Sequence, residues 1–184
     1  MDILQSIQHL DGEILLKIQQ YLRTDMLTPF MKAVTFLGNA GWFWILSTVI
    51  LLCIPKTRKT GIAAALSISF GFLVTNLFLK NLVARPRPFA VIDNLTVLIA
   101  KPTDFSFPSG HTTASFAVTL VMLWMLPKKA GIPAVILAAL VAFSRLYLGV
   151  HYPTDVLAGF VIALMGSTLA VWIVRRYFSG TLTG

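Results

Sequence analysis

The stretch "IPAVILAALVAFSRLYLGVH" (residues 132–151) decides what kind of protein this chain is. It is apolar over most of the roughly 20 residues that a helix needs to cross a membrane. Yet its last part contains Arg145 and His151. An ionisable side chain inside a membrane segment costs on the order of 2.5–3.5 kcal/mol on insertion scales and usually marks function. The stretch therefore predicts a transmembrane helix with a polar site at its end.

The composition of the whole chain agrees with a membrane protein. Of its 184 residues, 57% are hydrophobic and 12% are charged, and the mean hydropathy is +0.80. These values exclude an ordinary soluble domain. Apolar runs predict five spans, at residues 42–54, 61–79, 112–126, 132–148 and 156–174. We expect the first span to begin near Met26, which places Gly38, Asn39 and Gly41 inside it as a site for a kink.

Residues 1–25 have an amphipathic pattern. Ile3, Ile7, Leu10, Ile14, Ile18 and Leu22 alternate at helical spacing with Asp2, Asp11, Glu13, Lys17 and Arg23. This pattern predicts a helix that lies in the membrane interface, and the segment lacks the uninterrupted apolar core of a secretion signal. We therefore predict an all-α, polytopic membrane helical bundle of about five transmembrane helices plus an N-terminal amphipathic interfacial helix. We expect a single domain, 1–184, with the interfacial helix at 1–25 and the transmembrane bundle at 26–176.

Basic residues between the spans predict the orientation, because positively charged loops stay in the cytoplasm. The basic loops and tail contain Lys56, Arg58 and Lys59, then Lys128 and Lys129, and finally Arg175 and Arg176. With five spans they all fall on one side, so we expect an external N-terminus and an internal C-terminus. This signal accounts for most of the net charge of +8 and leaves little reason to expect a nucleic-acid partner.

Four span ends meet at the opposite face, and these ends carry ionisable residues that are rare in membrane segments. The segments are "KNLVARPRPF" (80–89), "PSGHTT" (108–113), "SRLYLGVH" (144–151) and "YPTD" (152–155). Lys80, Arg87 and Arg145 supply three cations, and a helix that begins at Gly110 and His111 directs free N–H groups toward them. Ser109 adds a hydroxyl, and the small Pro108–Gly110 turn lets the backbone approach a ligand. Together these groups predict an anion-binding site.

A second histidine, His151, belongs to the same group of span ends. Asp155 comes four residues after His151, and Pro153 suits the first turn of the next span. The carboxylate can accept the proton of one ring nitrogen and leave the other nitrogen free. A histidine oriented in this way is a candidate nucleophile.

Each residue taken alone also has a purely structural explanation. Lys80, Arg85, Arg87 and Lys101 could extend toward water at the interface, as basic residues near helix ends commonly do. His111 could bond a carbonyl at a helix start, and Asp155 could complement a helix dipole. Such explanations would have to coincide at four separate span ends on one face. A shared functional site explains the pattern better.

Three segments also resemble the signature of the type 2 phosphatidic acid phosphatase (PAP2) superfamily of membrane lipid phosphatases, which is related to vanadium-dependent haloperoxidases. The first motif is a lysine, six residues, then Arg-Pro, which Lys80, Arg87 and Pro88 fit. The second, Pro-Ser-Gly-His, is present at residues 108–111. The third is matched by Ser144, Arg145, His151 and Asp155. Arg85 has the wrong spacing for the first motif. Family members usually have six spans, so this chain departs from them at its N-terminus.

The resemblance implies a role for each of these residues. The residue matching His151 attacks phosphorus to give a phosphohistidine, and Asp155 orients it. His111 protonates the leaving group and then activates water. Lys80, Arg87 and Arg145, with Ser109 and the amide of Gly110, hold the phosphoryl oxygens. The resemblance implies no metal and no cofactor, and the sequence has no clustered carboxylates of the kind that hold magnesium.

We therefore expect a metal-independent lipid phosphatase in a bacterial-type plasma membrane, with its active site on the non-cytoplasmic face. Undecaprenyl pyrophosphate is the preferred substrate, with phosphatidylglycerol phosphate or phosphatidic acid as alternatives. A small anion-binding transporter or channel is the alternative from another class. The lipid would enter sideways between spans, and the long connection 89–107 would shape the entrance. The expected partners are this lipid and the bilayer, and the oligomeric state stays open.

Overall fold

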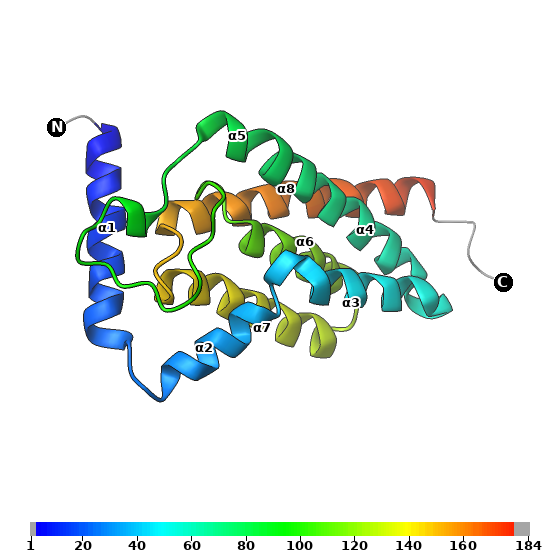
Figure 1. The fold of residues 1–184 in the computed structure, drawn as a ribbon. Coiled ribbons are helices and arrows are strands. Elements are labelled where there is room, and N and C mark those ends of the chain that lie inside the picture. Colours follow the sequence, from blue (N-terminus) through cyan, green and yellow to red (C-terminus); the bar gives the residue numbers. More distant parts are fainter. Residues whose placement is uncertain (1–2, 179–184) are drawn as a thin grey trace.

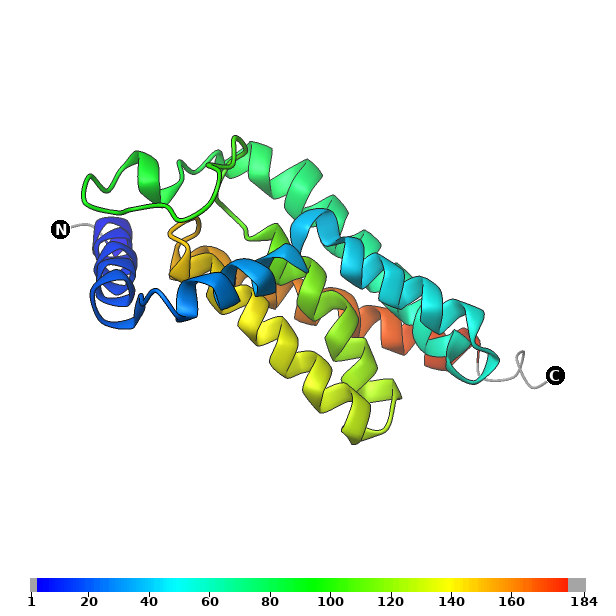
Figure 2. The same cartoon turned by 60° about the horizontal axis from the view of Figure 1, so that its bottom comes forward.

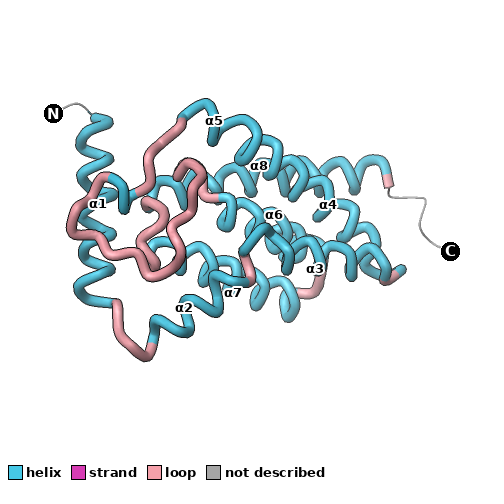
Figure 3. The backbone as a smooth tube through the Cα atoms, viewed as in Figure 1, coloured by secondary structure: helices cyan, strands magenta, loops and turns pink. Residues whose placement is uncertain are grey.

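The computed structural model describes residues 3–178, and this part of the chain contains helices and loops but no strand. Figures 1 and 3 show the order of the elements. The helices are α1 (Ile3–Leu22), α2 (Leu27–Phe36), α3 (Trp42–Cys53), α4 (Arg58–Phe72), α5 (Lys80–Val83), α6 (Gly110–Met125), α7 (Lys128–Tyr147) and α8 (Pro153–Tyr177). A π-helical stretch, Leu73–Leu79, joins α4 to α5. The predicted all-α fold is confirmed. Residues 1–2, which include Asp2, and 179–184 lie outside the described part.

Helix α6 lies at the centre of the bundle and packs against α4, α7 and α8. Its Val118 and Val121 are fully buried against Val141 of α7. Many large apolar side chains point outward instead, among them Ile136 at 56% exposure and Trp172 at 57%. Lipid tails are as apolar as leucine, so an outward apolar face is what a membrane bundle requires.

The structure supports several membrane spans without settling their number at five. Among the described residues, three helical segments are long and apolar enough to cross: Pro55–Ala90, Lys128–Tyr147 and Pro153–Tyr177. The bent pair α2 and α3 adds a fourth if it forms one span. Helix α6 has 16 residues, fewer than the roughly 20 that cross a hydrocarbon core. The count of five spans stays a prediction.

The predicted kink in the first span is present. Helices α2 and α3 are bent by 44° at a short 3₁₀ turn, Asn39–Gly41. Ala40 and Gly41 have φ values of 49° and 68° there, in the left-handed region that breaks a regular helix. The break turns the end of α2 toward the start of α6, which positions part of the site described below.

Helix α1 crosses one end of the bundle, as Figures 1 and 2 show. Ile7, Leu10 and Ile14 are exposed, so an apolar face is available to a membrane interface. Ile18, in contrast, is buried at 7% exposure and packs against the protein. The pattern was wrong for Asp11, which it placed on the polar face but which is only 2% exposed. The interfacial location of α1 stays a prediction.

The two ends of the bundle differ in character. The α3–α4 connection, the α6–α7 turn and the C-terminal end of α8 all lie away from α1 (Figures 1 and 2). These are the segments that carry the basic loops and tail. The connection 84–109 and the α7–α8 turn lie at the α1 end (Figure 3). The fold therefore separates the basic segments from the motif-bearing ones, as the orientation prediction requires.

Candidate active site

The start of α6 is built to present backbone N–H groups. Ser109 caps the helix, because its Oγ accepts hydrogen bonds from Thr112 N (3.4 Å) and Thr112 Oγ1 (3.0 Å). The Ser109 N–H donates to the backbone oxygen of Asp155 at 3.1 Å, which ties the start of α6 to the start of α8. The N–H groups of Gly110 and His111 have no partner within the helix. This end of α6 is thus suited to an anion.

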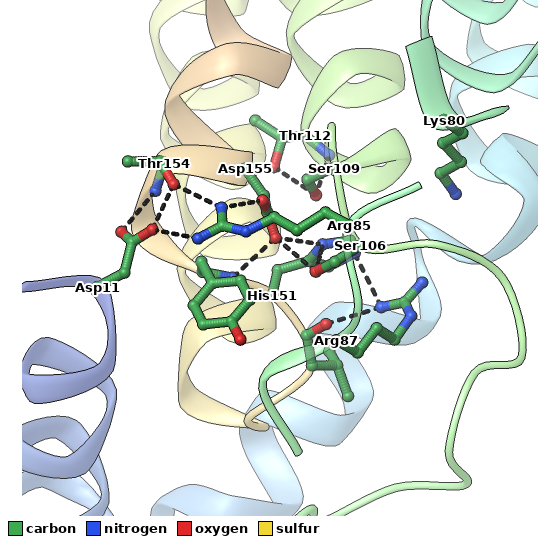
Figure 4. Close-up of polar contacts among 12 residues, drawn as sticks. Asp11, Lys80, Arg85, Arg87, Ser106, Ser109, Thr112, His151, Thr154 and Asp155 are labelled. Carbon is green, nitrogen blue, oxygen red and sulfur yellow. Dashed lines mark hydrogen bonds and ion pairs between the residues drawn. The ribbon is translucent and has the colours of Figure 1, made fainter. Parts of the chain in front are cut away.

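His151 is held by the carboxylate of Asp155. His151 Nδ1 lies 3.4 Å from Asp155 Oδ2, and the two side chains are 2% and 0% exposed. The same oxygen accepts from Ser106 Oγ at 2.5 Å and from the Tyr152 N–H at 2.9 Å. Figure 4 shows this cluster beside Arg87. The bonds fix the carboxylate, so it can fix the imidazole in turn.

The tautomer of His151 follows from its other neighbour. Arg87 Nη1 lies 3.3 Å from His151 Nε2, and a guanidinium can only donate. Nε2 must therefore carry the lone pair, while Nδ1 carries the proton that faces Asp155. Burial, together with the charges of Arg145 and Arg87, lowers the pKa of His151 to about 4 despite the opposing effect of Asp155. A neutral ring with a free Nε2 is the form that a nucleophile requires.

Arg87 and Lys80 both contact Asp104. Arg87 donates to Asp104 Oδ1 at 2.6 Å and to the Asp104 backbone oxygen at 2.8 Å, and Lys80 forms an ion pair with the same carboxylate. Burial alone would raise the pKa of Asp104, but Lys80 and Arg87 lower it to about 2. Both cations are therefore preorganised around an anionic group.

Arg145 is buried at 3% exposure near the end of α7. Its Nη1 donates to Thr35 Oγ1 of α2 at 2.7 Å, whereas its Nε is buried with no hydrogen-bond partner. Arg145 also lines the cavity described below, so its guanidinium is placed to meet an anion there.

His111 is positioned by the kink between α2 and α3. Its Nε2 lies 3.0 Å from Asn39 Oδ1. Gly38 is next to the ring, since a Cβ built there would lie only 2.5 Å from His111 Cδ2. The predicted kink in the first span thus positions His111, a candidate catalytic residue.

These groups surround one cavity of about 1210 Å³. Its polar end is lined by Lys80, Arg87, Asp104, Gly110, His111, Arg145 and His151. Its apolar part runs between α3 and α4, along Ile45, Val49, Leu52, Ile68 and Phe72. The connection 89–107 borders it through Ile99, Ala100 and Pro102. The cavity thus joins a cationic end to an apolar slot.

Of the eight predicted site residues, six line this cavity and two do not. Ser109 is fully buried, and its hydroxyl is engaged in capping α6. Asp155 lies behind His151, where an orienting carboxylate belongs. Within residues 3–178, no group of three or more His, Cys, Asp or Glu side chains is placed to hold a metal ion.

The structure adds residues that sequence reasoning missed. Asn39 bonds His111 and Thr35 bonds Arg145, while Ser106 contacts both Asp155 and His151. Arg85, which fails the motif spacing, donates to Asp155 Oδ1 at 2.7 Å, and Asp11 joins it from α1. No spacing rule links these positions. That Asp11 is buried on an amphipathic helix can be seen only once the fold is known.

Comparison with known proteins identifies the family to which this chain belongs. The family model of the PAP2 superfamily matches residues 60–179. An undecaprenyl-diphosphatase from Sulfolobus acidocaldarius is 35% identical over 161 residues, covering 86% of this chain and 76% of that protein. The undecaprenyl-diphosphatase BcrC of Bacillus subtilis is 35% identical over 141 residues, covering 77% and 72%.

A solved structure agrees with this family assignment. It is a transmembrane PAP2-type phosphatidylglycerolphosphate phosphatase from Bacillus subtilis, with a TM-score of 0.72, 28% identity and coverage of 96% of this chain and 88% of that one. The chain therefore belongs to the PAP2 superfamily and is a membrane protein. The three motif segments recognised in the sequence all lie within the matched region, and residues from each of them line the cavity.

Proposed function

We propose that this protein is a metal-independent lipid phosphatase that cleaves undecaprenyl pyrophosphate through a phosphohistidine at His151. The observation that carries the proposal is the single cavity with a cationic, histidine-bearing end and an apolar slot. A polyprenyl diphosphate has two complementary parts, an anionic diphosphate headgroup and a long apolar tail. The relatives named undecaprenyl-diphosphatase favour this substrate.

Binding begins with the phosphoryl oxygens. The terminal phosphate would meet Lys80, Arg87 and Arg145, which all line the cavity. The N–H groups at the start of α6 would complete the set of donors. Charge that develops on the equatorial oxygens during transfer is stabilised by donors that are already in place.

The first chemical step forms the phosphoenzyme. His151 Nε2, whose lone pair faces Arg87 and the cavity, attacks the terminal phosphorus. The bond between that phosphorus and the bridging oxygen breaks, and the departing lipid monophosphate takes a proton from His111. Asp155 holds the Nδ1 proton and stabilises the positive charge on the ring.

The second step releases inorganic phosphate. His111 removes a proton from a water molecule, which attacks the phosphohistidine and breaks the nitrogen–phosphorus bond. His151 then returns to its neutral form and phosphate leaves. Both histidines line the same cavity, so one phosphoryl group can be attacked first by His151 and then by the water that His111 activates.

The proposal includes the location of the reaction. We infer that the cationic end lies on the non-cytoplasmic face of the plasma membrane, since the basic segments lie at the other end of the bundle. The lipid would enter between α3 and α4 and keep its tail in the bilayer. Phosphatidylglycerol phosphate is the alternative substrate, because the 28% identical structure is a phosphatase for that lipid.

Phosphate release by the purified protein in EDTA tests the proposal. Wild type should release phosphate from undecaprenyl pyrophosphate, and His151→Ala should lose at least about 10³-fold of the rate because the nucleophile is gone. His9→Ala is a matched control, since that side chain is 60% exposed on α1. Equal rates for wild type and His151→Ala would remove His151 as the nucleophile.

The same assay separates the alternatives. A higher kcat/KM for phosphatidylglycerol phosphate or phosphatidic acid than for undecaprenyl pyrophosphate would replace the proposed substrate. Loss of activity in EDTA that returns with a divalent metal would contradict the metal-independent mechanism. Release of phosphate from none of these lipids would favour an anion-binding transporter or channel.

A further inference from the structure

A chain of charged residues leads from the active site to α1. Arg85 Nη1 donates to Asp155 Oδ1 at 2.7 Å, and Arg85 Nη2 donates to Asp11 Oδ2 at 2.8 Å. The guanidinium therefore lies between two carboxylates, and Figure 4 shows these contacts. The carboxylates are 0% and 3% exposed and the Arg85 side chain is 14% exposed. Buried charges of this kind are strongly coupled, because little water screens them.

Each member of the chain is held by further contacts. The Arg85 guanidinium carbon lies 3.8 Å from the centroid of the Tyr152 ring, which fixes its plane. Asp11 Oδ1 accepts from the Thr154 N–H at 3.1 Å, and Asp11 Oδ2 accepts from the Thr154 hydroxyl. The Arg85 backbone oxygen accepts from Ser106 N at 2.9 Å. Contacts from α1, from the α7–α8 turn and from α8 thus meet at the guanidinium of Arg85, whose backbone belongs to the α5–α6 connection.

The two carboxylate oxygens of Asp155 have different partners. Oδ2 faces His151, whereas Oδ1 faces Arg85. The bond to Arg85 holds the carboxylate in the rotamer that directs Oδ2 at His151 Nδ1. It also partly neutralises a negative charge that would otherwise be buried beside Asp11. The orientation of the nucleophile therefore depends on a residue that does not line the cavity.

We propose that Arg85 is a positioning residue for phosphoryl transfer, acting through Asp155, and that Asp11 of α1 holds Arg85 in place. The inference rests on the proposed role of His151 as nucleophile. Asp11 lies outside residues 60–179, which the family model matches. Helix α1 thus contributes a buried charge to the active site in addition to presenting its apolar face.

Steady-state kinetics of Arg85→Gln and Asp11→Asn test the proposal. We expect kcat to fall about 10- to 100-fold in Arg85→Gln, because misplacement of a reacting group by about 1 Å costs rates of this order. KM should change by less than about twofold, since neither residue contacts the substrate. Asp11→Asn should lower kcat in the same direction by a smaller factor. Glu13→Gln, on the same helix and 46% exposed, is the matched control and should keep the wild-type kcat.

A double-mutant cycle distinguishes positioning from simple destabilisation. If Arg85 acts through Asp155, then Arg85→Gln should cost little more in an Asp155→Asn background. The melting temperature of each variant shows whether the fold is intact. Additive losses in the double mutant, or a loss of kcat only where the melting temperature falls, would overturn the proposal.

A spectroscopic measurement separates this inference from the proposed function. The ¹⁵N spectrum of histidine-labelled protein reports the Nδ1–H tautomer of His151 without any substrate. We expect Arg85→Gln to shift the His151 resonances and Glu13→Gln to leave them unchanged. An unshifted spectrum together with a wild-type kcat would refute the role of Arg85. Failure of wild type to release phosphate would instead refute the proposed function.

Discussion

Arg87 holds the carboxylate of Asp104 at 2.6 Å with one nitrogen, while another of its nitrogens lies 3.3 Å from His151 Nε2. A negative group therefore already lies against a cation that we assign to the phosphate, within reach of the candidate nucleophile. Lys80 contacts the same carboxylate. An incoming phosphate must compete with Asp104 for these two cations.

This competition predicts that Asp104→Asn binds inorganic phosphate more tightly. Partly exposed ion pairs contribute up to about 1 kcal/mol, and the Asp104 side chain is 52% exposed. We expect the inhibition constant for phosphate to fall roughly two- to fivefold. Because the pKa of Asp104 is lowered to about 2, the effect should be the same at pH 5 and pH 8. A weaker affinity in the variant would show that Asp104 orients the cations and does not compete.

The protonation of His151 gives a second prediction. Its pKa is lowered to about 4, so the ring is neutral above that value and becomes charged only as the pH falls through it. The unfolded chain binds this proton more readily, so the free energy of unfolding falls as the pH drops from the ordinary histidine pKa of about 6.5 toward 4. In ¹⁵N-histidine spectra, His151 should keep its neutral Nδ1–H tautomer from pH 8 down to about pH 5. Titration at or above the ordinary histidine pKa of about 6.5 would contradict this environment.

The kink between α2 and α3 gives a third prediction, about His111. A Cβ on Gly38 would lie 2.5 Å from His111 Cδ2, so Gly38→Ala should displace the ring. We expect kcat to fall about 10- to 100-fold with a small change in KM. Ala40→Gly is the control at the same kink, because φ at Ala40 is 49° and glycine accepts this conformation readily. A wild-type kcat in Gly38→Ala would remove the kink from the mechanism.

The orientation in the membrane gives a fourth prediction. In a Cys53→Ser background, which has no other cysteine, Lys101→Cys should react in intact cells with a maleimide that cannot cross membranes. Lys128→Cys, at the opposite end of the bundle, should react only after the cells are permeabilised. The reverse result would place the cationic end of the cavity in the cytoplasm.

The sequence predicted the helical bundle, the kink and, except for Asp104, the residues that line the polar end of the cavity. These features are visible in sequence because they depend on local patterns, namely apolar runs and fixed motif spacings. Arg85 was set aside because it fails one such spacing. Its role, like that of Asp11, depends on contacts between residues 74 positions apart. Ser109 was expected to donate to the ligand; its Oγ accepts two hydrogen bonds at the start of α6 and the residue does not line the cavity, which spacing alone does not reveal.

The central claim is that His151 carries the phosphoryl group, and trapping the intermediate tests it most directly. Wild type and His111→Asn can be mixed with lipid diphosphate labelled with ³²P at the terminal phosphate and quenched within milliseconds. We predict an acid-labile, base-stable label on the peptide that contains residue 151, and a slower decay of this label in His111→Asn because water is no longer activated. Label on another residue, or the same label in His151→Ala, would contradict the account.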